Sequence, residues 1–273
     1  MLLVHAHPDD ECLTTGGTIA RYAQEGADVV LVTCTYGELG EVAEVPELGP
    51  PDAIRERLAE VRTDELREAC RRLGTVDLRL LGYHDSGMDG EPSNQEPVAF
   101  INQDLDEAAG KIADILREIR PQVVITYNEA GFYGHPDHIR AHQATLRAID
   151  LVDHDVPKLY YTAVPTSRLR AIRESFPREE EQSVEESFPE AEIERIGTDD
   201  DLIAAAIDVT DFVKHKFAAL EAHRTQYGTT ERFLSIPDEV RSVAMGTEHY
   251  VLARTTVGMP DGIESDLFER TGA

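Results

Sequence analysis

A short apolar run passes directly into a dense group of ionisable residues in the stretch Leu2-Leu3-Val4-His5-Ala6-His7-Pro8-Asp9-Asp10-Glu11. A related cluster, Gly134-His135-Pro136-Asp137-His138, follows a second apolar run at residues 123–127. Imidazoles and carboxylates at strand ends are the groups that a divalent metal and an activated water require. A single His-Pro-Asp often only starts a helix, because proline suits the first turn and aspartate the helix dipole. Two such clusters, both at expected strand-to-helix turns, favour a shared site over two helix starts.

Strand-like and helix-like patterns alternate through the first 150 residues. The expected strands are the apolar runs at residues 2–4, 29–34, 77–81, 123–127 and 250–253. The expected helices have an amphipathic or capped pattern at residues 18–25, 54–73, 105–119, 137–149 and 211–224. This order predicts an α/β fold: a Rossmann-like, mostly parallel sheet with helices on both faces and a smaller C-terminal appendage. Because such sheets bind ligands at the carboxyl ends of their strands, we expect both charged clusters at that edge.

The expected organisation is a single domain over residues 1–273, with an α/β catalytic core at 1–165 and a C-terminal part at 166–273. The C-terminal part carries an acidic insertion at 178–201, with eleven acids against two arginines. Such a charge run predicts an exposed lobe or a mobile insertion. The connections at 36–51 and 82–97 are long for a compact domain, and long loops are often functional.

Composition excludes several classes of partner. The 273 residues carry a net charge of 26 − 53 = −27, and such an acidic surface repels phosphate backbones, so we expect no nucleic-acid partner. No apolar run approaches the roughly 18 residues of a membrane span. His5 and Asp9 interrupt the first apolar run too early for a signal peptide, so we expect a cytoplasmic protein. The three cysteines are odd in number and predict no disulfide framework: Cys12, Cys34 and Cys70.

The two clusters together hold the side chains of a metal-dependent hydrolase. Catalytic zinc takes three protein ligands from His, Asp and Glu and leaves one position open. Two ligands from one loop and one from the other would place the metal across the strand ends. A remaining carboxylate would then serve as base, and a remaining histidine as acid or oxyanion stabiliser. Spacing alone leaves open whether Asp9 or Asp10 binds the metal.

The same clusters resemble the two signatures of the LmbE/PIG-L family of zinc-dependent N-deacetylases. The likeness continues through Val32-Thr33-Cys34-Thr35-Tyr36-Gly37-Glu38, Arg62-Thr63-Asp64-Glu65-Leu66, Leu81-Gly82 and Asp85-Ser86-Gly87-Met88. It spans about residues 1–150, and Asp266-Leu267-Phe268 adds a weak echo near the end. Within the family the chain is most similar to the mycothiol branch, which comprises the N-acetylglucosaminyl-inositol deacetylases and the mycothiol S-conjugate amidases.

The resemblance also implies a role for most residues of the two clusters. Three of them would be the metal ligands: His7, Asp10 and His138. Asp9 would be the general base that deprotonates the zinc-bound water, and His135 the general acid or oxyanion stabiliser. Asp137 would support the charge and orientation of His135, and Tyr133 would polarise the amide carbonyl in the transition state.

Three residues outside the clusters match positions at which relatives contact or enclose the substrate. Arg62 and Asp85 would bind sugar or inositol hydroxyls, and Met88 would line that pocket. From the residues alone, Arg62 could equally be an exposed helix residue and Asp85 a turn former. His5 and Glu11 are expected to be supporting residues. The other histidines have no comparable neighbourhood, and we expect structural or surface roles for them: His84, His142, His154, His215, His223 and His249.

We therefore expect a metal-dependent hydrolase that cleaves the N-acyl amide of an amino sugar, of the N-acetylglucosaminyl-inositol type. Zinc is the expected metal, and His/Asp ligation would also accept ferrous iron or another divalent ion. Three alternatives stay open: a mycothiol S-conjugate amidase, a deacetylase of another glycoconjugate or natural product, and a metal- or sugar-binding protein without turnover. The sequence also leaves open the aglycone, the acyl group, the native metal, a homo-oligomeric state and whether the acidity reflects a halophilic host.

Overall fold

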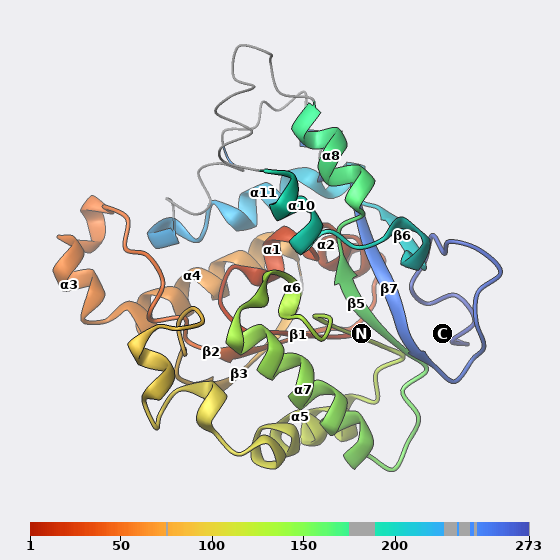
Figure 1. The fold of residues 1–273 in the computed structure, drawn as a ribbon, viewed down its shortest axis with the longest axis horizontal. Helices are drawn as coiled ribbons and strands as arrows, with labels where there is room; N and C mark the ends of the chain where they lie inside the picture. The colour runs from red at the N-terminus through yellow and green to blue at the C-terminus, as the bar shows by residue number, and fades with distance from the viewer. Residues whose placement is uncertain (75, 175–188, 227–233, 235–240, 243–244, 273) are drawn as a thin grey trace.

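The computed structural model describes residues 1–74, 76–174, 189–226, 234, 241–242 and 245–272. Within these ranges the chain forms a seven-stranded sheet with the order β3-β2-β1-β4-β5-β7-β6 (Figure 1). The strands are β1 (Leu2–His5), β2 (Val29–Thr35), β3 (Val76–Tyr83), β4 (Val123–Thr126), β5 (Lys158–Ala163), β6 (Ala205–Asp208) and β7 (Thr247–Thr255). The first five strands are parallel, whereas β7 runs antiparallel to β5 and β6. The expected fold class is confirmed.

Helices cover both faces of the sheet. The longer ones are α2 (Gly16–Gln24), α4 (Leu58–Leu73), α5 (Leu105–Ile119), α7 (Pro136–Leu151) and α11 (Val213–Leu220). The shorter ones are α1 (Asp10–Leu13), α3 (Pro51–Arg55), α6 (Gly131–Gly134), α8 (Thr166–Glu174) and α10 (Glu190–Ile196). Single 3₁₀ turns occur at η1 (Pro46–Leu48), η2 (Pro92–Gln95), η3 (Phe100–Asn102), η5 (Asp200–Leu202), η6 (Thr210–Phe212) and η7 (Arg224–Gln226). None of the described helices is long and apolar enough to cross a membrane.

The alternation of side chains along β1 divides the interior into two apolar cores. Leu3 packs into the core beneath α2, α4 and α11, whereas Leu2 and Val4 pack into the core beneath α5 and α7. This follows from the two-residue period of a strand, because successive side chains point to opposite faces. In Figure 1, α5 and α7 accordingly lie on one side of the sheet and α2 and α11 on the other.

The centre of the sheet contains a topological switch point. Leu2 of β1 pairs with Val30 of β2 on one side and with Val124 of β4 on the other. The chain leaves β1 toward α2 on one face, and leaves β4 toward α7 on the opposite face. Loops that diverge in this way open a crevice at the carboxyl ends of the two strands, where α/β sheets bind ligands. Both charged clusters follow these two strands.

The structure differs from the sequence-based expectation in four elements. Of the helix expected at 211–224 only α11 (Val213–Leu220) is α-helical, with the turn η6 before it and η7 after it. The helix expected at 54–73 is two helices, because Arg57 between α3 and α4 has a non-helical backbone with φ −131° and ψ 25°. Strands β5 and β6 were not expected. In β5, Lys158 is buried and pairs with Glu264 at 2.6 Å. Because Glu264 lies 106 residues further along the chain, the residues around Lys158 give no sign that a lysine can be buried in a strand there. In β6, the short segment Ala205–Asp208 contains one large apolar side chain, Ile207, which is too little to predict a strand.

The acidic segment expected at 178–201 is described only in part, since residues 178–188 lie outside the described residues. Its second half contains α10, which buries Ile193 and lies against α8 and α6. The Arg195 guanidinium of α10 donates a hydrogen bond to the carbonyl oxygen of Tyr133. The described half of the segment therefore packs beside the second charged cluster. The division into a core at 1–165 and a C-terminal part at 166–273 stays a prediction, although β6 and β7 extend the same sheet.

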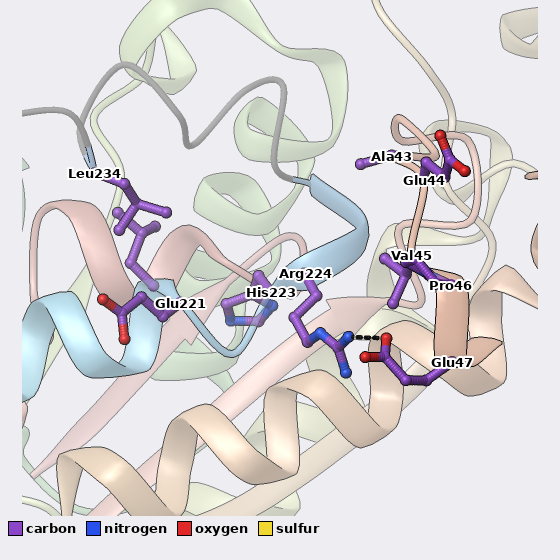
Figure 2. Close-up of a pocket in the computed structure, with 10 residues that line it drawn as sticks. Ala43, Glu44, Val45, Pro46, Glu47, Glu221, His223, Arg224 and Leu234 are labelled. Atoms are coloured by element: carbon purple, nitrogen blue, oxygen red, sulfur yellow. Dashed lines mark hydrogen bonds and ion pairs between the residues drawn. The ribbon is translucent and has the colours of Figure 1, made fainter.

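A hollow of about 560 Å³ lies between the loop at residues 43–47 and the end of α11 (Figure 2). Its lining includes the ion pair between Arg224 and Glu47. His223 forms part of its wall, but the expected metal ligands do not line it. The chemistry of the charged clusters is therefore located elsewhere, at the carboxyl edge of β1 and β4.

Candidate metal centre

The two charged clusters meet in space at the ends of β1 and β4. In the first, the chain turns after β1 and enters α1 at Asp10. In the second, His135 is the N-cap of α7 and accepts a hydrogen bond from the backbone N–H of Asp137, with Pro136 in the first turn. Both clusters do start helices, as the plain structural explanation of a His-Pro-Asp sequence requires. Because both helices start at the same edge of the sheet, the side chains of the two clusters also lie close together.

Three of these side chains form a compact triangle. The Nδ1 atom of His7 lies 3.3 Å from Asp10 Oδ2 and 3.3 Å from the Nε2 atom of His138. His138 Nε2 also lies 3.3 Å from Asp10 Oδ1. Ligand atoms held about 2.0–2.2 Å from a tetrahedral zinc ion are separated from one another by about 3.3–3.6 Å. The triangle therefore has the spacing of three ligands of one divalent ion, and these side chains stay candidate ligands within a group of His and Asp residues that could hold a metal.

Neighbouring side chains orient the three candidate ligands. The Tyr127 hydroxyl donates to Asp10 Oδ2 at 2.7 Å, and the backbone N–H of His7 donates to the same oxygen at 2.7 Å. The second ring nitrogen of His7, Nε2, lies 3.2 Å from Asp137 Oδ2 and 3.7 Å from Asp85 Oδ1. Carboxylates and hydroxyls behind metal ligands commonly fix their tautomer and direction. Side chains outside the triangle therefore fix the orientation of both Asp10 and His7.

The electrostatics of the triangle favour a positive charge. Burial by itself lowers the pKa of His7, but Asp10, Asp137 and Asp85 outweigh it and hold that pKa well above the usual value. Burial by itself raises the pKa of Asp10, but His138 and His7 hold it well below its usual range. The surrounding acids thus stabilise a cation at this point, which is the condition for binding a divalent metal.

Asp9 lies beside the triangle but is directed elsewhere. Its backbone has φ 99°, in the left-handed region that residues other than glycine rarely adopt. Its Oδ2 atom accepts a hydrogen bond from Arg62 at 2.8 Å. Burial raises the pKa of Asp9 to about 6, with Arg62 acting in the opposite direction. A strained backbone and a carboxyl that titrates near neutrality are features of functional sites.

His135 and Tyr133 place two donors near the same point. The His135 Nδ1 atom accepts the Asp137 backbone N–H, so the neutral ring carries its proton on Nε2. Burial and the nearby rings of His7 and His138 lower the pKa of His135 to about 3. The Tyr133 hydroxyl lies 3.5 Å from His138 Nε2, and burial raises its pKa, so it remains a phenol. Both groups can donate a hydrogen bond to a developing negative charge.

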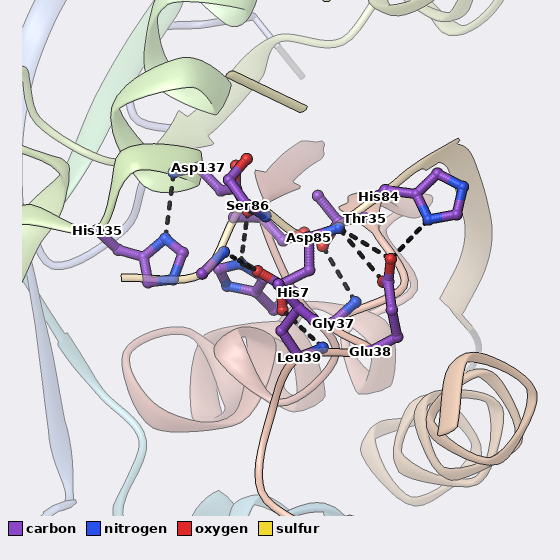
Figure 3. A network of polar contacts seen from close by, with 12 residues as sticks. His7, Thr35, Gly37, Glu38, Leu39, His84, Asp85, Ser86, His135 and Asp137 are labelled. Atoms are coloured by element: carbon purple, nitrogen blue, oxygen red, sulfur yellow. Dashed lines mark hydrogen bonds and ion pairs between the residues drawn. The ribbon is translucent and has the colours of Figure 1, made fainter. Parts of the chain in front are cut away.

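The Asp137 carboxylate lies against both His7 and Ser86. Its Oδ2 atom lies 3.2 Å from His7 Nε2 and accepts the Ser86 N–H at 2.9 Å (Figure 3). The Ser86 hydroxyl donates to the other carboxylate oxygen. The backbone N–H of Asp137 donates to His135 Nδ1, and the carboxylate acts to raise the pKa of the His135 ring. Asp137 therefore contacts a candidate metal ligand, and its support of His135 stays a prediction.

The expected substrate residues surround the same point. Arg62 is buried, with 3% of its surface exposed, which removes the alternative of an ordinary exposed helix residue. Its guanidinium donates to Asp9 and to the carbonyl oxygens of Pro8 and Gly37. Asp85 forms the turn that its sequence suggests, because its Oδ1 accepts the Gly87 N–H at 2.8 Å. Met88 is exposed. Their contacts with substrate stay predictions.

Several residues of the site gave no signal in the sequence. Tyr127 looks like the apolar end of a strand, Ser86 like a loop residue, and His223 falls among the histidines for which we expected structural or surface roles. The structure buries His223 and places its Nε2 atom 2.7 Å from Glu11 Oε1. The partner of each of these side chains lies more than 50 residues away in the sequence, so no local pattern indicates the contact.

A parallel α/β sheet with a histidine–aspartate metal-binding group at its switch point, and with carboxylate and phenol groups beside it, defines the class of metal-dependent hydrolases. Residues 2–149 match the family model described as PIG-L: GlcNAc-PI de-N-acetylase. A 1D-myo-inositol 2-acetamido-2-deoxy-alpha-D-glucopyranoside deacetylase of Geodermatophilus obscurus is 44% identical, over 98% of this chain and 96% of the relative. The chain belongs to the PIG-L (GlcNAc-PI de-N-acetylase) family. The resemblance and the expected enzyme class, an N-deacetylase hydrolase, are confirmed.

Solved structures confirm the fold. The N,N'-diacetylchitobiose deacetylase of Pyrococcus horikoshii superposes with a TM-score of 0.56 at 20% identity, over 92% of this chain and 82% of that one. The 4-carboxy-2-hydroxymuconate hydratase of Pseudomonas putida superposes with a TM-score of 0.62 at 18% identity, over 95% and 98% of the two chains. Because a hydratase shares the architecture, the fold by itself does not select deacetylation. The reaction depends on the side chains at the site.

Proposed function

We propose that this protein is a zinc-dependent deacetylase that hydrolyses the N-acetyl amide of a 2-acetamido-2-deoxyglucopyranosyl-inositol, releasing a free amine and acetate. The observation that carries the proposal is the triangle of His7, Asp10 and His138, with pairwise separations of 3.3 Å. A relative 44% identical over nearly the full length, named as a 1D-myo-inositol 2-acetamido-2-deoxy-alpha-D-glucopyranoside deacetylase, supports the substrate class.

In this proposal the ion is held by His7 Nδ1, His138 Nε2 and the Asp10 carboxylate. When bound, zinc supplies Lewis acidity and lowers the pKa of a water molecule to about 7. Asp10 is the carboxylate that lies between both histidines, whereas the Asp9 carboxylate is bonded to Arg62. That placement supports Asp10 as the ligand and leaves Asp9 for proton transfer. Ferrous iron or another divalent ion would suit the same donors.

Asp9 is the proposed general base. Its carboxylate remains partly exposed, at 23%, so an incoming water can reach it. A pKa of about 6 leaves it ionised at neutral pH yet still basic enough to accept a proton. The Arg62 guanidinium fixes the direction of Oδ2 and leaves Oδ1 without a hydrogen-bond partner among the described residues. We assign proton acceptance to Oδ1.

His135 and Tyr133 are the proposed donors to the reacting amide. The N–H at His135 Nε2 would stabilise the oxyanion, because a neutral ring with a pKa lowered to about 3 has no extra proton to deliver. The proton that the Asp9 carboxylate accepts from water would then pass to the departing amine. The Tyr133 phenol would donate to the carbonyl oxygen as it becomes negative. Both assignments are supported by their donor state, since the His135 ring is neutral with its proton on Nε2 and Tyr133 keeps its hydroxyl hydrogen.

Recognition of the sugar and inositol hydroxyls is assigned to the rim of the site. Asp85 borders the metal group, with Oδ1 at 3.7 Å from His7 Nε2, and Met88 is exposed three residues later. The Arg62 guanidinium already donates to Asp9, so only its remaining edge could contact the substrate. We therefore propose that Arg62 acts on the substrate largely through the position of Asp9.

One panel of amides tests the proposal. Metal-loaded protein is assayed for release of acetate and amine from N-acetylglucosaminyl-inositol, from N-acetylglucosaminides with other aglycones, and from a cysteinyl-glucosaminyl-inositol S-conjugate. The proposal predicts the highest kcat/KM for N-acetylglucosaminyl-inositol. A higher value for the cysteinyl conjugate would identify an amidase instead. No release from any N-acylglucosaminide, with metal bound, would identify a binding protein without turnover.

A further inference from the structure

A second group of titratable side chains lies behind Asp9 and has no part in the mechanism above. It consists of Glu11, Cys12 and His223, all of which are buried. Glu11 and Cys12 belong to α1, directly after the metal group, whereas His223 follows α11 near the far end of the chain. The three residues therefore join the first charged cluster to the C-terminal part of the protein.

The separations within this group are those of hydrogen bonds. His223 Nε2 lies 2.7 Å from Glu11 Oε1, and the Cys12 Sγ atom donates to the same oxygen at 3.1 Å. Ligand atoms that share a zinc ion would be about 3.3–3.6 Å apart, and a pair that includes sulfur would be farther apart still. The triangle of His7, Asp10 and His138 meets that spacing, and this second group does not. We therefore assign it to positioning rather than to a second metal.

Glu11 uses both carboxylate oxygens. Oε1 receives the bonds from His223 and Cys12, and Oε2 accepts the backbone N–H of Asp9 at 2.9 Å. The Glu11 carbonyl oxygen in turn accepts the Thr15 hydroxyl at 2.9 Å. The contacts of Oε1 with His223 and Cys12 restrict the direction of the carboxylate, so Oε2 stays aimed at the Asp9 N–H.

That N–H belongs to a residue whose conformation needs support. Asp9 has φ 99°, which L-residues rarely adopt unless the surrounding structure imposes it. Arg62 holds the Asp9 side chain at 2.8 Å, and Glu11 holds its backbone. His223 is buried, and its other ring nitrogen, Nδ1, has no hydrogen-bond partner among the described residues. Among the described residues, the only hydrogen bond of the His223 ring is therefore the one that fixes Glu11.

We propose that Glu11 and His223 are positioning residues for Asp9: Glu11 holds the left-handed Asp9 backbone through its N–H, and His223 locks the Glu11 carboxylate in that direction. The inference rests on the proposed role of Asp9 as base. It gives the C-terminal part of the chain a share in catalysis without contact with the substrate. A misdirected base should lower kcat more than it raises KM, because the rate of the chemical step depends most strongly on the geometry of the reacting atoms.

The test compares two substitutions of nearly equal size. Glu11→Met removes the acceptor for the Asp9 N–H, whereas Glu11→Gln retains an oxygen acceptor. On the amide that the panel shows to be cleaved, we expect Glu11→Met to lower kcat by about tenfold or more, with KM and bound metal within about twofold of wild type. Glu11→Gln should recover most of that loss. Wild-type kcat in Glu11→Met would overturn the proposal.

A matched control separates positioning from general destabilisation. Glu264→Gln removes a carboxylate that is equally buried and equally paired, with Lys158 at 2.6 Å, but on another part of the sheet. We expect it to lower Tm while kcat at 25 °C is unchanged. A kcat loss of the same size in both Glu11→Met and Glu264→Gln would overturn the proposal. Should Glu11→Met not fold, His223→Leu and His223→Gln make the same comparison, since only glutamine retains an N–H for Glu11. Equal kcat in these two variants would likewise overturn it.

Asp9→Asn, measured alongside, separates this inference from the proposed function. If Asp9→Asn turns over at the wild-type rate, Asp9 is not the base and the proposed mechanism fails first. If Asp9→Asn is inactive while Glu11→Met keeps full kcat, only the positioning inference fails.

Discussion

The Nδ1 atom of His7 lies 3.3 Å from the Nε2 atom of His138, although 131 residues separate the two histidines in the sequence. The parallel pairing of β1 with β4 brings them together, because it aligns Leu2 with Val124 and so ends both strands at one edge. Asp10 lies against both rings at the same spacing.

Removing the metal should abolish turnover and loosen the fold. Without a bound cation, the carboxylates around His7 lack the positive charge of the metal and repel one another. We expect a chelator to eliminate acetate release and zinc to restore it. Zinc at 100 times its Kd should add about 2.7 kcal/mol to the free energy of unfolding. His138→Ala should lose both metal and activity, as measured by metal analysis and assay. Full activity in metal-free protein would contradict the assignment.

Asp9→Asn should separate catalysis from metal binding. The substitution leaves all three ligand atoms in place but removes the proton acceptor. We expect bound zinc to remain within about twofold of wild type while kcat falls by about 10²- to 10⁴-fold. Stoichiometric metal content together with near wild-type kcat would show that another group is the base.

The pH dependence of kcat/KM should report the Asp9 carboxyl. Burial raises its pKa to about 6, and a base acts only when ionised, so activity should fall as pH falls through the Asp9 pKa. The positive charge of a bound metal acts to lower that pKa. We therefore expect the acid limb at about pH 6 or below, with the rate proportional to the ionised fraction. An acid limb centred above pH 7 would not fit Asp9.

Tyr127→Phe should weaken metal binding without touching the ligands. The Tyr127 hydroxyl donates to Asp10 Oδ2 at 2.7 Å and accepts the Ala6 N–H at 2.9 Å. Loss of such support typically lowers metal affinity by about 10- to 100-fold. Competition with a chelator of known affinity measures the change. Tyr22→Phe is the matched control, because its hydroxyl bonds to Asp266, outside the metal group, and it should leave metal affinity unchanged.

Local pattern in the sequence determined the elements and the chemical types of this protein. Apolar strands of period two, amphipathic helices and His-Pro-Asp helix starts each depend on neighbours a few residues away, so they can be read along the chain. The same local chemistry placed His7, Asp9, Asp10, His135, Asp137 and His138 at strand ends. It also missed β5, because the buried Lys158 is neutralised by Glu264 from a remote segment.

Only the tertiary structure decided how those side chains are arranged. Asp10, and not Asp9, lies between His7 and His138. The Asp137 carboxylate lies against His7, Tyr127 against Asp10 and His223 against Glu11. Contacts over such separations depend on strand pairing and helix packing, which sum many weak interactions across the whole chain. No short stretch of sequence contains the information on strand pairing and helix packing. The sequence by itself therefore specified which side chains are available, and the tertiary structure specified how they are arranged.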